Sequence, residues 1–310
     1  MPEGPYPVYG ASGIVGYLPS YQNGAPYVAV VKDGAGVGRV CRCKGESSVL
    51  GTMQALIPFN DVNCSFLFHL VRSLRLGSGF SGSTIPHIYF KDYGKRIVRL
   101  PDLNDQRTIA AILDGVESIA ATREGYLAKL DDLRKSRFIE MFGDPDANPK
   151  RFETKLGSAL FKIGNGKARS QNLRYEAGIP AYGGNGVSWY TDEVLVDHPT
   201  IIIGRVGRHC GNTRLVEEAC WVTDNAMYIR KFLGNCYDVV FLDALMRIIG
   251  FNRFADRGDL WKITQKPFME YSFPVPPLAL QREFAAFVRQ VDKLEFRCTG
   301  TPDEGDNAVR

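Results

Sequence analysis

The stretch that decides the fold is Pro101-Asp102-Leu103-Asn104-Asp105-Gln106-Arg107-Thr108-Ile109-Ala110-Ala111, because it opens a helical pattern that continues to Phe142. Over residues 104–142, a helix would be about 58 Å long at ~1.5 Å per residue. Gly143-Asp144-Pro145 ends it with a C-cap glycine and a helix breaker. Apolar residues recur three and four apart, which is typical of a coiled-coil seam: Ile109, Ile112, Val116, Ile119, Tyr126, Leu130 and Leu133. Such a helix needs a partner helix.

The helix opening occurs a second time, 175 residues later, as Pro276-x-Leu278-x-x-Gln281-Arg282-x-x-Ala285-Ala286. A second match lies upstream at an offset of 173, where residues 6–13 correspond to residues 179–186 and further identities reach position 49. Most of the shared residues are Gly, Pro and Tyr, which fix turns and close backbone approaches. We infer an internal duplication of roughly 174 residues, far longer than the ~20–50 residues of solenoid repeats.

Each copy has the pattern of an α+β globule followed by a helix. We expect strands at 28–31, 49–57, 200–203 and 226–229, and helices at 64–76 and 237–249. The predicted organisation is a first globule at 1–101, a long helix at 102–143, a second globule at 144–277, a short helix at 278–296 and a disordered polar tail at 297–310.

The second copy has a leader, residues 150–178, whose counterpart in the first copy would fall mostly before Met1. We expect the two long helices to pair as an antiparallel coiled coil. Because the second helix is short, apolar surface from about 126 to 142, or its counterpart, should stay uncovered and take another subunit or a second copy of the chain.

Composition limits the function classes only broadly. The 310 residues suit two domains, with 45% apolar residues, 23% charged residues and a net charge of +4. The pI near 8.6 is weak evidence for nucleic acid by itself. Seven cysteines without a C-x-x-C pair indicate free thiols in a reducing cytosol. The N-terminus has no signal-peptide pattern and no apolar run could cross a bilayer, so we expect a cytoplasmic protein without a membrane partner.

The whole arrangement resembles the specificity subunit of type I restriction–modification enzymes, shortened at both ends. The resemblance rests on the two Pro-x-Leu-x-x-Gln-Arg openings, the Pro-x-Tyr-Gly turns at Pro7 and Pro180, the Gly-x-x-x-Gly runs that begin at Gly34 and Gly207, and Phe142-Gly143-Asp144-Pro145. It implies that each globule is a target-recognition domain reading half of a split site in double-stranded DNA. It also implies that the helices dock methyltransferase subunits, beside a separate nuclease and translocase subunit.

Under this resemblance, DNA contacts are expected from polar and basic residues on loops that can reach base edges and phosphates. Arg205 follows the apolar, buried-looking strand at 200–203, and Lys32 occupies the matching place in the first copy, which suits a shared phosphate contact. The full set of expected DNA-binding residues is Lys32, Arg39, Arg42, Lys44, Ser83, Thr84, Lys167, Arg169, Ser170, Gln171, Tyr182, Asn185, Arg205, Arg208, His209, Arg253, Arg257 and Lys262. The expected subunit-docking residues are the seven seam residues of the long helix.

We expect no catalytic residue, no metal and no cofactor, because no nucleophile motif or methyltransferase motif is present. Two other hypotheses stay open. Pro145-Asp146 with Glu153-Thr154-Lys155 spells a nuclease-like P-D…E-x-K pattern, so a stand-alone metal-dependent nuclease using Asp146 and Glu153 is one alternative. The other is a silent specificity-gene remnant that folds but does not assemble.

Overall fold

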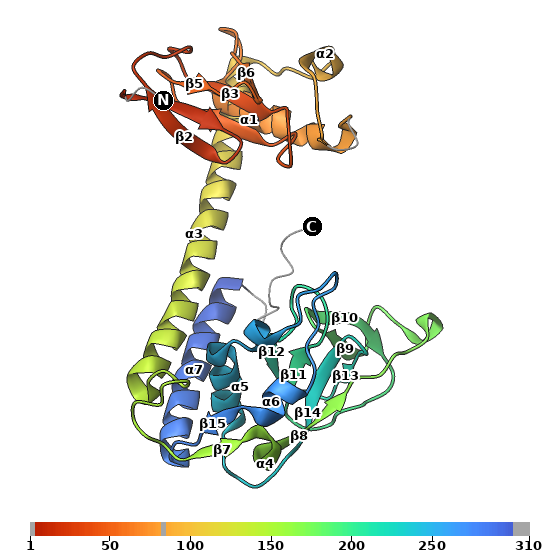
Figure 1. Cartoon of the computed structure of the whole chain (residues 1–310). Helices are drawn as coiled ribbons and strands as arrows, with labels where there is room; N and C mark the ends of the chain where they lie inside the picture. The colour runs from red at the N-terminus through yellow and green to blue at the C-terminus, as the bar shows by residue number, and fades with distance from the viewer. Residues whose placement is uncertain (1–3, 82–84, 300–310) are drawn as a thin grey trace. The chain divides into compact units, whose positions relative to one another are not determined.

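A computed structural model describes residues 4–81 and 85–299 of the chain (Figure 1). It divides into two compact units, residues 1–122 (unit 1) and 123–310 (unit 2). The boundary lies inside α3, a 40-residue helix that spans Leu103–Phe142. The predicted long helix is therefore present, and Gly143 ends it with φ +77°, a conformation that favours glycine.

Unit 1 contains two three-stranded sheets with α1 packed against β3 and β4. The sheet orders are β2-β1-β5, in which β5 is parallel to β1, and β4-β3-β6, which is antiparallel. The elements are β1 (Tyr6–Gly10), β2 (Gly13–Leu18), β3 (Tyr27–Val31), β4 (Val40–Cys43), β5 (Ser48–Val49), β6 (Met53–Leu56), α1 (Cys64–Ser73), η1 (Leu76–Gly79) and α2 (Phe90–Tyr93). The predicted strand at 49–57 is thus two strands, because Gly51 and Thr52 form a turn.

Unit 2 repeats this plan and adds strands to it. Its sheets have the orders β10-β9-β13, β12-β11-β14-β8 and β15-β7. The elements are β7 (Thr154–Leu156), α4 (Gly157–Leu160), β8 (Phe161–Asn165), η2 (Gln171–Leu173), β9 (Ile179–Gly183), β10 (Gly186–Thr191), β11 (Thr200–Gly204), β12 (Thr213–Val216), β13 (Trp221–Val222), β14 (Ala226–Phe232), α5 (Val239–Ile249), η3 (Phe251–Phe254), α6 (Lys266–Glu270), β15 (Ser272–Pro274) and α7 (Leu278–Thr299). Together the two units confirm the α+β class.

The glutamine of the repeated helix opening performs the same task in both copies. Gln106 Oε1 accepts from the backbone N–H of Asn63 at 2.8 Å, and its Nε2 donates to the carbonyls of Asp61 and Pro101 at 2.9 Å each. Gln281 makes the same three bonds 175 residues later, to residues 238, 236 and 276. Both side chains are buried, at 1% and 0% exposure. We call this three-bond arrangement the glutamine clasp; it ties the start of the long helix to the start of α1 or α5.

The Gly-x-x-x-Gly runs also have one structural role in both copies. Gly38 and Gly211 have φ values of +81° and +83°. A Cβ atom on Gly38 would lie 2.1 Å from the backbone nitrogen of Gly77, and one on Gly211 would lie 2.4 Å from that of Asn252. The second glycine is therefore required for both its conformation and the close approach of the next 3₁₀ turn.

Within unit 2, α7 packs antiparallel against the C-terminal part of α3 (Figure 1). The rings of Phe138 and Phe284 lie 5.4 Å apart, while Arg134 pairs with Asp292 at 2.8 Å, further along α7. Phe138 and Phe142 are buried at 1% and 4% exposure, together with Met141. The expectation that residues 126–142 stay uncovered is therefore wrong for Leu130, Phe138, Met141 and Phe142, which are buried in unit 2. It holds for Tyr126, Leu133 and Ile139, which are 44%, 45% and 45% exposed.

No helix in the described part of the chain is both long enough and apolar enough to cross a membrane. All seven cysteines are free thiols. Burial raises the pKa of the Cys43 and Cys220 thiols to about 12, so these two are protonated at neutral pH.

Candidate nucleic-acid interface

One end of the main sheet of unit 2 gathers most of its predicted DNA-binding residues. Because β11 runs antiparallel to both β12 and β14, and β14 runs antiparallel to β8, the ends of β8 and β11 lie beside the starts of β12 and β14. The loops that follow β8 and β11 therefore leave the sheet at the same place. We call this surface the loop end of unit 2.

Backbone hydrogen bonds fix these loops to one another. The N–H of Arg205 donates to the carbonyl of Asn225 at 3.0 Å, and the carbonyl of Arg205 accepts from Ile263 at 2.9 Å. The N–H of Gly207 donates to Trp261 at 2.8 Å, which joins the loop after β11 to the hairpin that carries Arg257 and Lys262. The N–H of Lys167 donates to Val222 at 2.8 Å, next to the turn that holds Asn225. The exposed basic residues brought together here are Lys167, Arg205, Arg208, Arg257 and Lys262.

A groove of about 570 Å³ adjoins this surface and is lined by backbone and polar side chains. Asn185 and His209, both predicted from the sequence, line it together with Asn212. Asn212 and Asn225 are exposed and were not predicted, although Asn-containing turns between strands are a usual signal for reachable polar loops. Trp261 was also missed; it is 38% exposed, with the guanidinium of Arg257 4.8 Å from its ring centre.

Unit 1 places Lys32 and Arg39 at the corresponding end of its sheet. Lys32 follows β3 as Arg205 follows β11, and its carbonyl accepts from Ile88 at 2.9 Å. Arg39 precedes β4 and donates through Nη1 to the carbonyl of Ala11 in the β1–β2 turn at 2.9 Å. Ser83 and Thr84 lie outside the described residues. Lys44 is exposed, but it follows β4 and so lies at the opposite end of the sheet.

Arg42 is engaged inside unit 1. Its Nη2 donates to the carboxylates of Asp114 and Glu117, the latter at 3.1 Å, and its guanidinium lies 4.1 Å from the ring centre of Phe68. Arg72 also pairs with Glu117. The charge of Arg42 is therefore balanced by α3, and the contact holds β4 against this helix.

Three predicted residues of unit 2 are similarly occupied. The side chain of Arg169 is only 7% exposed and pairs with Asp192 and Glu193. These two residues follow β10, whereas Asn185 precedes it, so Arg169 and Asn185 lie at opposite ends of this strand. The exposed Ser170 and Gln171 follow it in the same loop. Tyr182 is 8% exposed and donates to Glu218 at 2.7 Å. Burial, together with this carboxylate, raises the pKa of Tyr182, which keeps the phenol neutral. Arg253 pairs with Asp146.

The two carboxylates of the nuclease hypothesis each have partners within the protein. Asp146 accepts from both guanidinium nitrogens of Arg253, at 2.5 and 2.7 Å, and from the Tyr271 hydroxyl at 2.7 Å. The hydrogen bond from Arg253 is the main reason that the pKa of Asp146 lies below its ordinary value. Glu153 is exposed and lies 3.5 Å from Lys155. Both oxygens of Asp146 thus bind protein donors, which is typical of a structural ion pair rather than a metal ligand.

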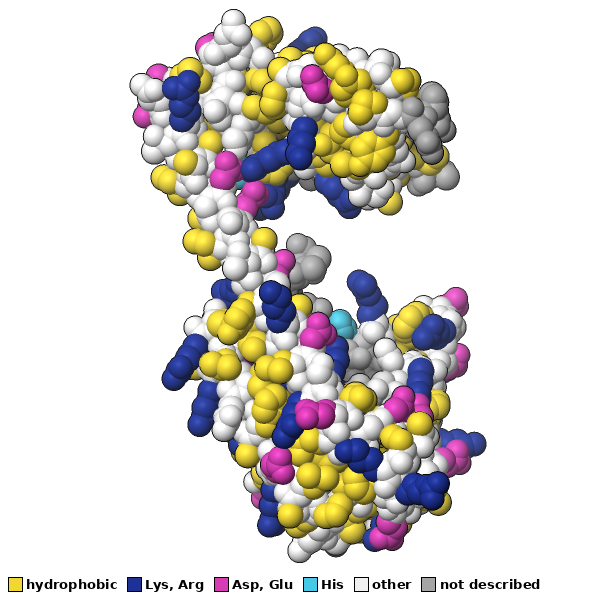
Figure 2. All heavy atoms as spheres, turned by 90° about the vertical axis from the view of Figure 1, so that its left-hand side faces the viewer, with side chains coloured by type: hydrophobic (Ala, Val, Ile, Leu, Met, Phe, Trp, Pro, Cys, Tyr) yellow, Lys and Arg dark blue, Asp and Glu magenta, His cyan; other side chains and the backbone are white. Residues whose placement is uncertain are grey.

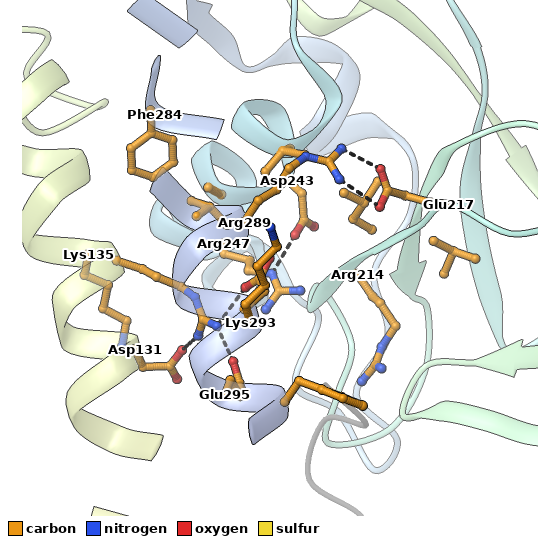
Figure 3. Close-up of a pocket in the computed structure, with 18 of the residues that line it drawn as sticks. Asp131, Lys135, Arg214, Glu217, Asp243, Arg247, Phe284, Arg289, Lys293 and Glu295 are labelled. Carbon is orange, nitrogen blue, oxygen red and sulfur yellow. Dashed lines mark hydrogen bonds and ion pairs between the residues drawn. The ribbon is translucent and has the colours of Figure 1, made fainter. Parts of the chain in front are cut away.

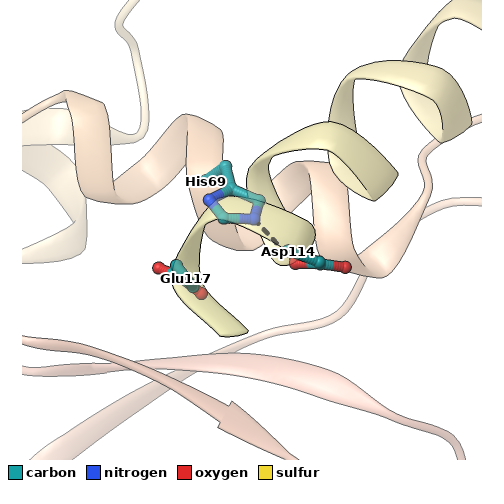
Figure 4. Close-up of side chains that lie close together, drawn as sticks. All are labelled: His69, Asp114 and Glu117. Carbon is teal, nitrogen blue, oxygen red and sulfur yellow. Dashed lines mark hydrogen bonds and ion pairs between the residues drawn. The ribbon is translucent and has the colours of Figure 1, made fainter. Parts of the chain in front are cut away.

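Figure 4 shows His69 and Asp114 meeting between α1 and α3, with Glu117 one turn further along. Within residues 4–81 and 85–299, these three form the one group of histidine, cysteine and acidic side chains whose ligand atoms converge, within 4.8 Å. Arg42 and Arg72 occupy the same carboxylates, so the group is an ion-pair network. Burial opposes ionisation of Asp114, but hydrogen bonds from His69, Ser65 and Arg42 outweigh it and lower the pKa of Asp114.

A second cavity of unit 2, of about 870 Å³, lies among α3, α5, α7 and β12 (Figure 3). Apolar side chains such as Phe284 and Val288 line it, and ion pairs surround it. Arg289 pairs with Glu217 at 2.7 Å, which joins α7 to the strand end of β12. Arg134 pairs with Asp131, Asp292 and Glu295, which joins α3 to α7. These pairs fix the helices around the cavity.

The expected docking residues of α3 differ in their exposure. Leu130 is 5% exposed and belongs to the interior of unit 2. The other six are exposed, and Figure 2 shows hydrophobic side chains on the surface of α3. Their exposed fractions range from 37% for Ile109 to 71% for Ile119, and they include Ile112, Val116, Tyr126 and Leu133. An apolar stripe of this kind on a single helix indicates a binding surface.

The sequence model of one protein family, the type I restriction modification DNA specificity domain, matches residues 2–131 and 149–300, one segment in each copy. The chain belongs to this family. A member of the type I specificity family from Escherichia coli, the type I restriction enzyme EcoprrI specificity subunit, is 25% identical over 199 residues. The match covers 61% of this chain and 49% of that protein, so the chain spans about half the length of this curated relative.

The fold is also found in a solved structure. The type I restriction-modification system S subunit from M. genitalium superposes with a TM-score of 0.66 at 19% sequence identity, over 97% of this chain and 85% of that one. This similarity confirms the duplicated α+β fold, and the family match over residues 2–131 and 149–300 confirms the sequence-based prediction of the family.

Proposed function

We propose that the chain is a DNA-recognition subunit of a type I restriction–modification enzyme. Each unit would read one half of a split site in double-stranded DNA, in the cytoplasm where the DNA lies. The observation that carries the proposal is the loop end of unit 2, where five exposed basic residues and several polar residues lie on loops that extend from the same end of the sheet. Lys32 and Arg39 lie at the corresponding end of the sheet in unit 1. Basic residues bind phosphates, and Asn, Gln and His side chains reach base edges.

The DNA face we propose comprises the exposed basic residues of the loop end, with Lys32 and Arg39. Among residues 4–81 and 85–299, Lys262 is the one member of this set with a carboxylate within 4 Å. Arg205 and Arg208 are its centre, because the backbone bonds of their loop hold them beside the hairpin of Lys262. Lys262 lies 3.7 Å from Asp256, but both side chains are more than 60% exposed, so this pair is weak and open to exchange for a phosphate. Arg42, Arg169, Tyr182 and Arg253 are left out, because their polar groups are already bound within the protein.

The exposed stripe of α3 is the surface that we propose for the methyltransferase subunits, with a nuclease and translocase subunit or a second copy of the chain joining the assembly. The family membership supports this assignment, and so does the apolar character of Ile112, Val116 and Ile119. In this proposal the chain contributes recognition, while its partners contribute methyl transfer and cleavage.

Selection from a library of random double-stranded DNA tests the proposal. The full chain, mixed with its methyltransferase subunit, is expected to enrich two blocks of defined sequence separated by a spacer of fixed length. Arg205→Ala should weaken binding and lower the dependence of log affinity on log salt by about one unit per lost phosphate contact. Lys231→Ala is the matched control, because this exposed lysine lies at the opposite end of β14. Enrichment of a single block, or of none, would overturn the proposal.

The nuclease hypothesis has its own test. Purified chain with Mg²⁺ and plasmid DNA is expected to leave the DNA intact. Cleavage that disappears in Asp146→Ala would instead identify the chain as a metal-dependent nuclease and refute a purely recognising role.

A further inference from the structure

The segment around His87 in unit 1 makes the same backbone hydrogen bonds as the segment around Lys262 in unit 2. In unit 1, the N–H of Ile88 donates to the carbonyl of Lys32 at 2.9 Å, and His87 exchanges two backbone bonds with Ser81 at 2.7 and 2.9 Å. In unit 2, the same bonds join residues 263 and 205 at 2.9 Å, and residues 262 and 256 at 2.9 and 3.0 Å. His87 therefore occupies in unit 1 the place that Lys262 occupies at the loop end of unit 2.

The side chains at this place differ in their chemistry between the two copies. Lys262 has only N–H donors, whereas an imidazole ring can also accept a hydrogen bond. In unit 1, Nδ1 of His87 lies 2.6 Å from Oδ1 of Asp33, the residue that directly follows Lys32. Val206 is the counterpart of Asp33, because it forms the same backbone bridge to Lys262 that Asp33 forms to His87. Unit 2 thus has no carboxylate at the position of Asp33.

Asp33 determines which ring nitrogen of His87 is left for a ligand. An ionised carboxylate only accepts hydrogen bonds, so Nδ1 carries the proton of this bond. In the neutral ring, Nε2 is then an acceptor. Neither Nε2 of His87 nor Oδ2 of Asp33 has a hydrogen-bond partner among residues 4–81 and 85–299. We call these two acceptor atoms, with the bond that joins their side chains, the acceptor pair of unit 1.

The acceptor pair is open to solvent and held in a fixed orientation. The side chains of His87 and Asp33 are 35% and 29% exposed. Ile88 is only 5% exposed, and in an extended segment the residues on either side of it point to the opposite face, away from the core. The ring of Tyr89 stacks on the imidazole at 6.3 Å with an interplanar angle of 17°. A ligand would therefore meet an imidazole whose orientation is already set.

A role in stability alone does not account for the acceptor pair. Exposed side-chain pairs contribute little to stability, and the backbone bonds of His87 and Ile88 already hold the segment, together with one from Gly34 to Pro86 at 3.0 Å. A carboxylate at this end of the sheet repels phosphate, unlike the neighbouring Lys32. The acceptor pair therefore suits a base edge that presents a donor. In the major groove these donors are the amino groups N6 of adenine and N4 of cytosine.

We propose that Asp33 and His87 of unit 1 recognise the exocyclic amino group of an adenine or a cytosine in the major groove. Nε2 of His87 accepts from the amino group, while Asp33 orients the ring and offers Oδ2 as a second acceptor. The inference rests on the proposed function and adds the chemistry of one position in the half site of unit 1. At the equivalent place in unit 2, Lys262 presents donors only, so the two copies have opposite hydrogen-bonding character there.

Selection from random double-stranded DNA, with the full chain and its methyltransferase subunit, tests this assignment. One variant is His87→Ala. A second, the double variant Asp33→Val and His87→Lys, gives unit 1 the side chains that unit 2 has at these places. The matched control is His198→Ala, because His198 is also exposed and lies 3.1 Å from a carboxylate, that of Asp197. It precedes β11 and so lies at the end of the sheet opposite to Arg205.

The readout is the base preference at each position of the two enriched blocks. The unmodified chain should restrict one position of one block to adenine or cytosine on one strand. His87→Ala should reduce this preference by about fivefold or more at that position only. The double variant should transfer the preference to guanine, whose O6 and N7 accept from lysine. The other block should stay unchanged in every variant, and both blocks should stay unchanged in the control.

The outcomes separate this inference from the proposed function. Two enriched blocks whose base preferences are the same in all variants would overturn the role of the acceptor pair and leave the proposed function standing. Weaker binding of all sequences by the same factor would also overturn it, because the two residues would then act on the phosphates or on folding. Failure of the unmodified chain to enrich any block would overturn the proposed function, and this inference with it.

Discussion

Replacing Gln281 with methionine should remove the glutamine clasp of unit 2 with little change in side-chain volume. The variant loses three hydrogen bonds of 2.8–2.9 Å and leaves an N–H and two carbonyl groups without their partner. A net hydrogen bond contributes about 0.5–1.5 kcal/mol, and an unsatisfied buried group costs about 1–3 kcal/mol. We therefore expect the free energy of unfolding of unit 2 to fall by roughly 3 kcal/mol, which corresponds to about 6–12 °C in Tm for a unit of this size.

Thermal and denaturant unfolding, followed by hydrogen exchange to separate the two units, measures this loss. Gln106→Met should destabilise unit 1 by a similar amount, because its clasp has the same three bonds. Arg282→Met is the control: the neighbouring side chain is exposed, and its replacement should change stability by no more than about 0.5 kcal/mol. A loss below about 1 kcal/mol for Gln281→Met, or an equal loss for the control, would refute the reasoning.

Three further predictions follow from the packing and the ion pairs. Phe284→Ala should lower the free energy of unfolding of unit 2 by about 3–5 kcal/mol, because the ring is fully buried among Phe138, Phe142 and Phe241. Denaturant unfolding measures this loss, and a value below about 1 kcal/mol would contradict the assigned core. The pKa of Asp114 is lower in the folded state than its ordinary 3.8, so Asp114 stabilises unit 1 above that pH, and this stabilisation is lost as the pH falls through the folded pKa. In Asp114→Asn, the free energy of unfolding of unit 1 should therefore fall less steeply as the pH is lowered. An unchanged pH dependence in the acid range would exclude this role. The double variant Ile112→Asp and Ile119→Asp should abolish co-purification with the methyltransferase subunit while leaving the circular dichroism spectrum unchanged, whereas retained co-purification would move the docking surface elsewhere.

The duplication, the long helix and the α+β class could be predicted because they depend on local periodicity and on repeated turn residues. The second glycines of the Gly-x-x-x-Gly runs, Gly38 and Gly211, illustrate this. Their positive φ values favour glycine, so the same residue occurs at this position in both copies. The part of α3 that α7 covers could not be predicted in the same way. The apolar seam continues through both halves of α3, and only tertiary packing decides which of its residues are buried: Leu130 is 5% exposed and Leu133 is 45% exposed.

The proposed DNA face follows from the sequence only in part, for a related reason. Arg205 and Lys32 follow buried strands, a pattern visible along the chain, and the structure places both at the same end of their sheets. Arg42 looks equally suitable in the sequence, but its carboxylate partners Asp114 and Glu117 lie 72 and 75 residues away. Whether an arginine is available to a ligand depends on such long-range pairs, which no local pattern reveals.

All three partners of each clasp glutamine are backbone atoms: one amide nitrogen and two carbonyl oxygens. Side-chain identity at positions 61 and 236 can therefore vary without changing the donors and acceptors that the glutamine meets. A recombination event that replaced everything upstream of Gln106 or Gln281 with a different globule of the same fold would still deliver these three groups. The clasp itself therefore places no demand on the side chains of the globule, unlike the ion pairs by which Arg42 and Arg72 bind Asp114 and Glu117 of α3. A globule exchanged as a whole would keep the clasp even where such ion pairs are lost.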